Sequence, residues 1–160
     1  VYKVSKSIVS CPKNLADIAK TDQKKYKFEL IDYNLHKVSF VHSSMALAGC
    51  IYYFYLHGLE NVGQPFNKFE KYLIWSSMGY FIFDTIATVT LQVGEAMYMF
   101  HHVFVVLGIA LAFVCRQWGC VTVIGILVGE ISGPNLAARR LLQWHPSFAV
   151  RTFNDVMFCG

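Results

Sequence analysis

The sequence predicts an all-α protein, a polytopic bundle of transmembrane helices. Of its 160 residues, 55% are hydrophobic and only 15% are charged, whereas a soluble domain carries about 25% charged residues. The mean hydropathy is positive. Eight of the fourteen basic residues precede position 38, and the others flank long apolar runs. Because lipid offers no partner for an unpaired backbone group, these apolar runs are expected to be helices.

The apolar runs divide the chain into a polar start and a series of spans. Residues 1–37 are polar and rich in lysine, and we expect a basic loop or tail there. Four apolar segments follow, and another begins near residue 153. The four cover about residues 38–56, 72–91, 98–115 and 118–142. A bilayer core takes about 20 helical residues, so each segment is long enough to cross it. Pro134 is expected to kink or break the fourth.

The distribution of basic residues predicts the orientation. If the spans alternate, eleven basic residues lie on the side that holds residues 1–37, and three lie on the other side, namely Lys68, Lys71 and Arg116. The side richer in lysine and arginine is normally cytosolic. We therefore expect a multi-pass membrane protein with a cytosolic N-terminal segment. Most of the excess comes from that segment, since the count without it is three to three.

Five histidine, aspartate or glutamate residues lie within the predicted spans, all in the half nearer the predicted cytosolic side: His42, Asp84, His101, His102 and Glu130. Charged groups are costly inside a bilayer and normally face protein or a water-filled cavity. Adjacent helical residues point about 100° apart, so one paired histidine can face a cavity while the other bonds a neighbouring helix. A carboxylate facing an imidazole fixes its tautomer and raises its basicity. We expect these groups to line one cytosol-facing polar cavity, with Glu130 at its rim.

Each of these residues also has a purely structural alternative. His42 could be solvated near the interface, and the histidine pair could be an interfacial polar patch. Asp84 could form a structural bond to another helix, and Glu130 could bond locally near the kink. Asp84 also belongs to a polar stripe at helical spacing that contains Tyr80. The Gly125-x-x-x-Gly129 spacing fits close packing of two helices.

The sequence carries little sign of other chemistry. The six histidines form no H-x-x-x-H or H-x-x-H-H box, so we expect no di-iron site. A haem held by two histidines of different helices is an alternative that no spacing supports, and we expect no metal and no cofactor. The five cysteines form no C-x-x-C pair. The basic residues lie beside apolar segments and form no basic stripe, so nucleic acid is not an expected partner.

Five segments, in order, resemble the TLC-domain membrane proteins, the family that includes the ceramide synthases. They are YNLHKVSFVHS (Tyr33–Ser43), GYFIFDT (Gly79–Thr85), HHVFVVLG (His101–Gly108), EISGPNLAARRLL (Glu130–Leu142) and FNDVMF (Phe153–Phe158). The likeness is closest to the small TLC-domain-containing transmembrane proteins of the endoplasmic reticulum and other membranes. It implies that residues 38–160 are a partial TLC domain, with four to five spans visible and at least one span missing at each end.

The resemblance implies a role in lipid metabolism or homeostasis, and it leaves open whether the protein is an enzyme. In ceramide synthases, catalysis is attributed to the paired histidines together with a His-Asp-x-x-Asp motif. The pair and Asp84 carry over, so His101, His102 and Asp84 are the candidate catalytic residues. The stretch Gly129–Gly133 corresponds to the second motif and contains neither histidine nor aspartate.

We therefore favour a protein that binds or regulates membrane lipids through the polar cavity. Residues expected to contact the cavity or a lipid headgroup are His42, Glu130, Tyr80, Ser132 and Arg139. The alternative is an acyltransferase that resembles ceramide synthase in N-acylation, with acyl-CoA as co-substrate and one histidine of the pair as base or nucleophile. A cargo receptor or adaptor is a third class, which would show protein partners. The expected partners are membrane lipids, the expected membrane is the endoplasmic reticulum, and the oligomeric state is open.

Overall fold

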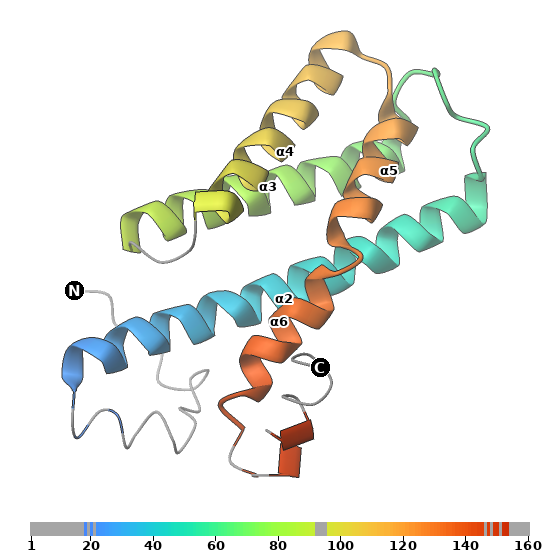
Figure 1. Ribbon diagram of the computed structural model, residues 1–160. Coiled ribbons are helices and arrows are strands. Elements are labelled where there is room, and N and C mark those ends of the chain that lie inside the picture. The colour runs from blue at the N-terminus through green and yellow to red at the C-terminus, as the bar shows by residue number, and fades with distance from the viewer. Residues whose placement is uncertain are drawn as a thin grey trace. The chain divides into compact units, whose positions relative to one another are not determined.

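The described part of the chain is helical. The structure, a computed structural model, describes residues 18, 20, 22–91, 96–145, 147, 149, 150, 152 and 153, with the backbone only at 96–98. Its helices are, in chain order, α2 (Gln23–His57), α3 (Lys68–Leu91), α4 (Ala96–Cys115), α5 (Gly119–Glu130) and α6 (Gly133–Leu142) (Figure 1). The β structure within these residues is one isolated antiparallel bridge between Pro65 and Gln117. The all-α prediction is confirmed for this part of the chain.

Helix α2 begins earlier than the hydropathy pattern indicated. We expected residues 1–37 to be a loop or tail, but residues 23–37 form the first part of α2. The reason is local, because Asp22 caps the helix: its Oδ1 accepts hydrogen bonds from the backbone N–H groups of Lys24 and Lys25, both at 3.0 Å. Neither proline nor glycine then interrupts the chain before Gly49. Within the expected tail, residues 1–17, 19 and 21 lie outside the described residues.

The ends of α2 and α3 follow recognisable local signals. After α2, Gly58 adopts a left-handed conformation with φ 53°, which is the usual way for a helix to end. Helix α3 begins with a capping box. The Asn67 side chain accepts a hydrogen bond from the Glu70 backbone N–H, and the Glu70 carboxylate accepts one from the Asn67 backbone N–H, both at 2.8 Å.

The fourth predicted span forms two helices. Helices α5 and α6 are separated by Ile131 and Ser132, so the expected break near Pro134 is present. Pro134 lies in the first turn of α6, where its missing N–H costs no helical hydrogen bond. The stretch Gly119–Leu142 is, within the described residues, the one helical run long and apolar enough to cross a membrane by those measures, and Met99–Cys115 is apolar but shorter. The multi-pass arrangement therefore stays a prediction, as does the span expected to start near residue 153.

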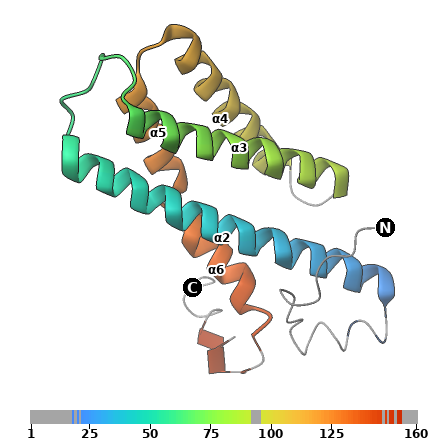
Figure 2. The ribbon, with the colours of Figure 1, turned by 180° about the vertical axis from the view of Figure 1, so that it is seen from behind.

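The chain forms two compact units, Val38–Leu136 and a second made of Val1–Lys37 with Ala137–Gly160. In the first unit, α3 packs against α4 and α5, and α4 contacts α5 (Figure 2). Its buried apolar core draws on α2, α3, α4 and α5 and contains Ala46, Cys50, Tyr53, Ile74, Ile109, Cys120, Val123 and Ile126. All of the titratable residues singled out within the predicted spans belong to this unit.

Candidate functional site

His102 and Asp84 form a buried pair between α4 and α3. The Nδ1 atom of His102 lies 3.3 Å from Oδ2 of Asp84, and the two residues are 2% and 1% exposed. This contact is within ion-pair distance but does not have hydrogen-bond geometry, so it places a carboxylate next to the imidazole without fixing the tautomer of the ring. The structure therefore brings together the imidazole and the carboxylate that the sequence placed in different spans.

His101 points to a different place, a cavity of about 410 Å³ between α4 and α5. On α4 and α5 the cavity is lined at helical spacing by Val105, Gly108, Ile109, Leu111, Ala112, Cys115, Trp118, Val121, Thr122, Gly125, Ile126 and Gly129. Its polar end is formed by His101 and Glu130. The two histidines thus separate as their angular spacing predicts, with one on the cavity and one on a neighbouring helix.

Glu130 is a buried carboxylate on this cavity. It is 7% exposed and lines the cavity near His101. Among the residues that the structure describes, none gives the Glu130 side chain a hydrogen bond or an ion pair. Asp84 lies within electrostatic range of Glu130. A buried carboxylate is costly without a partner, so this end of the cavity favours a group that donates hydrogen bonds or carries positive charge.

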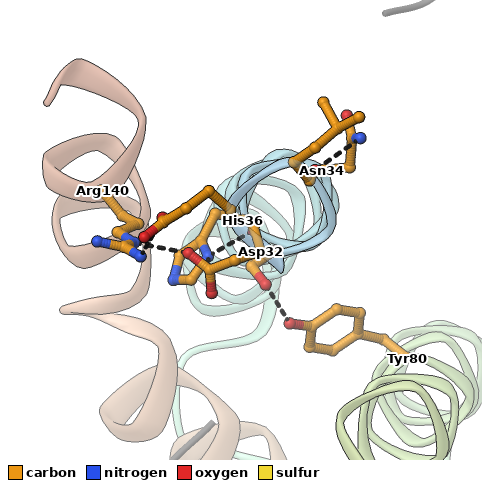
Figure 3. A network of polar contacts seen from close by, with 8 residues as sticks. Asp32, Asn34, His36, Tyr80 and Arg140 are labelled. Atoms are coloured by element: carbon orange, nitrogen blue, oxygen red, sulfur yellow. Dashed lines mark hydrogen bonds and ion pairs between the residues drawn. The ribbon is translucent and has the colours of Figure 1, made fainter. Parts of the chain in front are cut away.

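An aromatic cluster lies beside the cavity. The His42 ring stacks on Tyr80 with 3.8 Å between ring centroids, and the Tyr80 hydroxyl donates a hydrogen bond to the Ser39 hydroxyl at 2.8 Å (Figure 3). Nε2 of His42 is buried and has no hydrogen-bond partner among the described residues. Phe81 lines the cavity and also contacts the rings of His42, His101 and His102 edge-on.

Fewer of the expected residues line the cavity than the sequence suggested. His42, Asp84 and His102 are absent from its lining, and the rings of His42 and His102 contact Phe81 edge-on. The reason is that Phe81 of α3 lies between these groups and the cavity beside α5. The spacing of residues along a single helix does not reveal this position. Glu130 lines the cavity, whereas we expected it at the rim.

Two other expected headgroup contacts are not brought to this cavity. Ser132 is exposed in the break between α5 and α6. Arg139 lies on α6 in the part of the chain that belongs to the second unit. Their roles stay predictions, as do the roles of the other candidate residues.

Arg140 is a residue that sequence analysis missed. Its Nε donates to Asp32 at 2.6 Å and an Nη donates to Glu29 at 3.1 Å (Figure 3). All of these residues belong to the second unit. Glu29 and Asp32 are three residues apart on α2, a spacing that places both carboxylates on one face. That spacing indicates an acidic face, but the sequence alone does not identify the arginine that pairs with it.

A second buried polar cluster, also missed, joins the start of α3 to the end of α2. Tyr53 donates a hydrogen bond to the Glu70 carboxylate, and Asn61 donates to the Tyr53 hydroxyl at 3.3 Å. Glu70 is 1% exposed, and a Cβ on Gly119 would lie 2.3 Å from its Oε2. Glu70 precedes Asp84 by fourteen residues, about 20 Å along a helix. The Asn67-x-x-Glu70 capping box is the signal that could have pointed to it.

The described part of the chain has no cluster of side chains arranged to bind a metal ion. No group of three histidine, cysteine, aspartate or glutamate side chains there could hold an ion. The expectation of no metal, made from the missing histidine boxes, stays a prediction.

Comparison with known proteins identifies the domain. A family model, the TLC domain, matches residues 32–158, which agrees with the resemblance seen in the five segments. No solved structure matches this chain.

Proposed function

The chain belongs to the TLC-domain family of membrane proteins, and from this we propose that it binds a membrane lipid in the cavity between α4 and α5. The relation to ceramide synthases holds at the level of the family. Family membership makes the protein, in broad terms, a membrane protein of lipid metabolism or homeostasis. The proposal adds where the lipid lies and which residues contact its polar group.

One observation carries the proposal: the cavity has apolar walls along most of its length and polar groups at one end. Leu111, Ala112 and Ile126 are typical of those walls, while His101 and Glu130 form the polar end. Inside a bilayer the chain has already left water, so these walls accept it through van der Waals packing and do not gain a further hydrophobic term. A headgroup that donates hydrogen bonds or carries positive charge would stabilise the buried Glu130 carboxylate. A lipid combines both features in one molecule.

The outer surfaces of the helices support a membrane environment. Large apolar side chains are exposed on α3 and α4, among them Tyr72, Phe104 and Val114, which are 70–79% exposed. Soluble monomers rarely expose extended apolar surface. We place the protein in the endoplasmic reticulum membrane as a multi-pass protein with a cytosolic N-terminal segment, supported by the lysine distribution and by the resemblance. The polar end of the cavity would then lie in the cytosolic half.

The headgroup would first meet His101 and Glu130. Tyr80 and His42, which stack beside Phe81, are further candidates for contact, together with Ser132 and Arg139 beyond the end of α5. His42 offers a buried ring nitrogen with no hydrogen-bond partner among the described residues, so a small movement of Phe81 would let it contact a headgroup.

Lipid retention by the purified protein tests this proposal. The full-length protein is extracted in mild detergent, and the lipids that remain bound are identified and counted by mass spectrometry. We expect His101→Ala and Glu130→Gln to lose most of the bound lipid, because each removes a group from the polar end. Glu60→Gln is the matched control, since Glu60 is exposed in the loop before α3. Equal lipid retention in all three variants and the unchanged protein would contradict the proposal.

Acyl transfer is the second candidate, and the His102–Asp84 contact favours it. A histidine oriented by a carboxylate can take the proton from an acceptor amine while the amine nitrogen attacks the thioester carbonyl of acyl-CoA. The new C–N bond replaces the C–S bond, and the proton passes to the leaving thiolate. A base must reach the proton it removes, however, and the cavity reaches His101 while the carboxylate contacts His102. This separation and the lack of histidine and aspartate in Gly129–Gly133 favour binding without turnover.

Turnover separates the two candidates. The purified protein is supplied with radiolabelled acyl-CoA and a sphingoid base, and N-acylated product is measured. Product formation that is lost in both His101→Ala and His102→Ala, with Glu60→Gln unchanged, would establish acyl transfer. Absence of product in a preparation that retains lipid supports the binding function.

A further inference from the structure

We propose that the polar end of the cavity selects lipids whose head carries a protonated primary amine. This inference rests on the proposed function, because it concerns the head of the lipid that lies between α4 and α5. It names the chemical class of that head and assigns its recognition to the Glu130 carboxylate. In a bilayer every lipid can offer a hydrocarbon chain to the apolar walls, so the polar end decides which lipid is retained.

Glu130 presents a buried carboxylate to the cavity. Its side chain lines the cavity, although the residue is only 7% exposed. An ionised carboxylate accepts hydrogen bonds through its two oxygen atoms and donates none. Among the residues that the structure describes, none gives either oxygen a hydrogen bond or an ion pair. The acceptor capacity of this carboxylate is therefore left for a ligand.

The described side chains around the carboxylate are themselves acceptors. A Cβ atom added to Gly133, where α6 begins, would lie 2.9 Å from Oε2 of Glu130 and 3.2 Å from Oγ of Ser43. One carboxylate oxygen and the Ser43 hydroxyl therefore both lie beside this glycine. The hydroxyl donates its one proton to the carbonyl oxygen of Ser39 at 2.8 Å, so it presents lone pairs to its other neighbours. Asp84, whose charge acts on Glu130, is a second acid.

His101 adds a further acceptor at the same end. Its Cε1 atom would lie 3.8 Å from a Cβ atom on Gly129, the residue before Glu130, so the ring lies against this part of α5. A neutral imidazole has one ring nitrogen that accepts a hydrogen bond. Among the described residues that line the cavity, none is a lysine or an arginine, the side chains that bind phosphate best. The polar end therefore favours a positively charged donor over an anionic group.

A protonated primary amine matches these acceptors in charge and in donors. Like the lysine ammonium, it carries one positive charge and three N–H donors on a small group. A quaternary ammonium such as choline carries the same charge but has no N–H, so it would leave the buried carboxylate without a hydrogen bond. An alcohol head has one donor and no charge. Ethanolamine phospholipids and long-chain amines without phosphate both carry the primary amine. Because His101 is exposed on the cavity, a phosphate can remain outside.

Competition photolabelling of the full-length protein in phosphatidylcholine vesicles tests the inference. Two probes carry a diazirine group on an octadecyl chain, one with an amine head and one with an alcohol head. The competitors are octadecanol, octadecylamine and the N-methyl, N,N-dimethyl and N,N,N-trimethyl derivatives of this amine. The amines keep the chain and the positive charge while the number of N–H donors falls to none. Lysophosphatidylethanolamine and lysophosphatidylcholine form a second pair. Peptide mapping identifies saturable label on α4 or α5.

We expect competition to weaken with each added methyl group, by about tenfold or more between the primary and the quaternary amine. Glu130→Gln should lose this difference, because the amide has no charge and itself donates hydrogen bonds. Glu130→Asp keeps the charge, so it should keep the order of the competitors. Glu60→Gln, in the exposed loop before α3, is the matched control and should behave like the unchanged protein. Labelling of Glu130→Gln by the alcohol probe shows that the variant folds.

Three results would overturn the inference. If neither probe gives saturable label on α4 or α5, the proposed function fails and the inference fails with it. If the alcohol probe labels the cavity but all the amines and octadecanol compete equally, only the inference fails. If Glu130→Gln keeps the preference for the primary amine, another group recognises the head, and again only the inference fails. Stronger competition by lysophosphatidylethanolamine than by lysophosphatidylcholine would identify an ethanolamine phospholipid as the source. A preference confined to the amines without phosphate would identify a long-chain amine, and either source supports the inference.

Discussion

Nδ1 of His102 lies 3.3 Å from Oδ2 of Asp84, and both side chains are almost completely buried. His101, the next residue back along the chain, lines a cavity on another side of α4. Two adjacent residues of one type therefore have different environments. His102 joins α4 to α3, and His101 is available to a ligand, so substitutions at the two positions should have different consequences.

A double-mutant cycle should detect this difference. We expect Asp84→Ala and His102→Ala to be coupled by about 1–3 kcal/mol, because removing either partner leaves the other buried without its contact. Asp84→Ala and His101→Ala should be nearly additive. The measurement is the free energy of unfolding of each single and double variant in detergent. Equal coupling of Asp84 to both histidines would contradict the assignment.

The Glu70 cluster should contribute to stability. Glu70→Ala removes one half of the capping box at the start of α3 and leaves the Tyr53 hydroxyl without its carboxylate. We expect a loss of about 2–4 kcal/mol, the sum of a lost cap and an unpaired buried group. Thermal unfolding in detergent measures it, with Glu60→Ala in the exposed loop as the control. A change no larger than that of the control would show that the cluster is not stabilising.

A side chain at Gly119 should destabilise the protein. A Cβ there would overlap the Glu70 carboxylate and lie 2.9 Å from Cδ1 of Phe66, so either the Glu70 side chain leaves its hydrogen bonds or the start of α5 moves. We expect Gly119→Ala to cost about 1–3 kcal/mol through overpacking. The matched control Gly79→Ala meets no neighbour and should be neutral or slightly stabilising. The midpoint of thermal unfolding compares them, and equal midpoints would refute the close approach.

Arg140 should hold α6 against the first part of α2. Arg140→Lys keeps the charge but loses the two-point contact with Asp32 and Glu29, because lysine lacks the planar fork of arginine. We expect faster hydrogen exchange in residues 23–37, with a loss of about 1 kcal/mol of local stability, since the pair is partly exposed. Lys27→Ala on the same helix is the control. Unchanged exchange in Arg140→Lys would contradict the prediction.

The proposed orientation can be tested by cysteine labelling in intact microsomes. An impermeant maleimide added outside should label Lys24→Cys, because Lys24 is exposed in the segment assigned to the cytosol. Cys115 is exposed and ends the third predicted span, on the side away from the N-terminal segment, so it should react only after the membrane is opened. Single-cysteine variants make the readout unambiguous. Labelling of Cys115 in sealed microsomes would reverse or exclude the orientation.

Local sequence patterns predicted the helices well and their ends less well. Three of the apolar segments lie inside α2, α3 and α4, and the fourth breaks beside its proline. The start of α2 was placed too late because hydropathy does not register a helix whose residues are polar. The Asp22 cap governs that start, and capping is a backbone effect independent of apolar content.

Part of the candidate site could also be predicted from local sequence patterns. The spacing of 3.6 residues per turn requires His101 and His102 to point in different directions, which is what the structure has. It does not say which of them meets Asp84, or that Phe81 lies between the aromatic cluster and the cavity. Those relationships depend on how α3 rotates against α4 and α5.

By itself the sequence determined the helical class, the break at Pro134 and the family, because each depends on residue types at fixed positions along the chain. Only the tertiary structure decided that His102 lies against Asp84, that Arg140 pairs with Asp32, and that His101 lines the cavity. The physical reason is that a charged or polar side chain interacts strongly only with groups within a few ångströms of it. Those neighbours come from helices distant in the chain, and side-chain packing selects them.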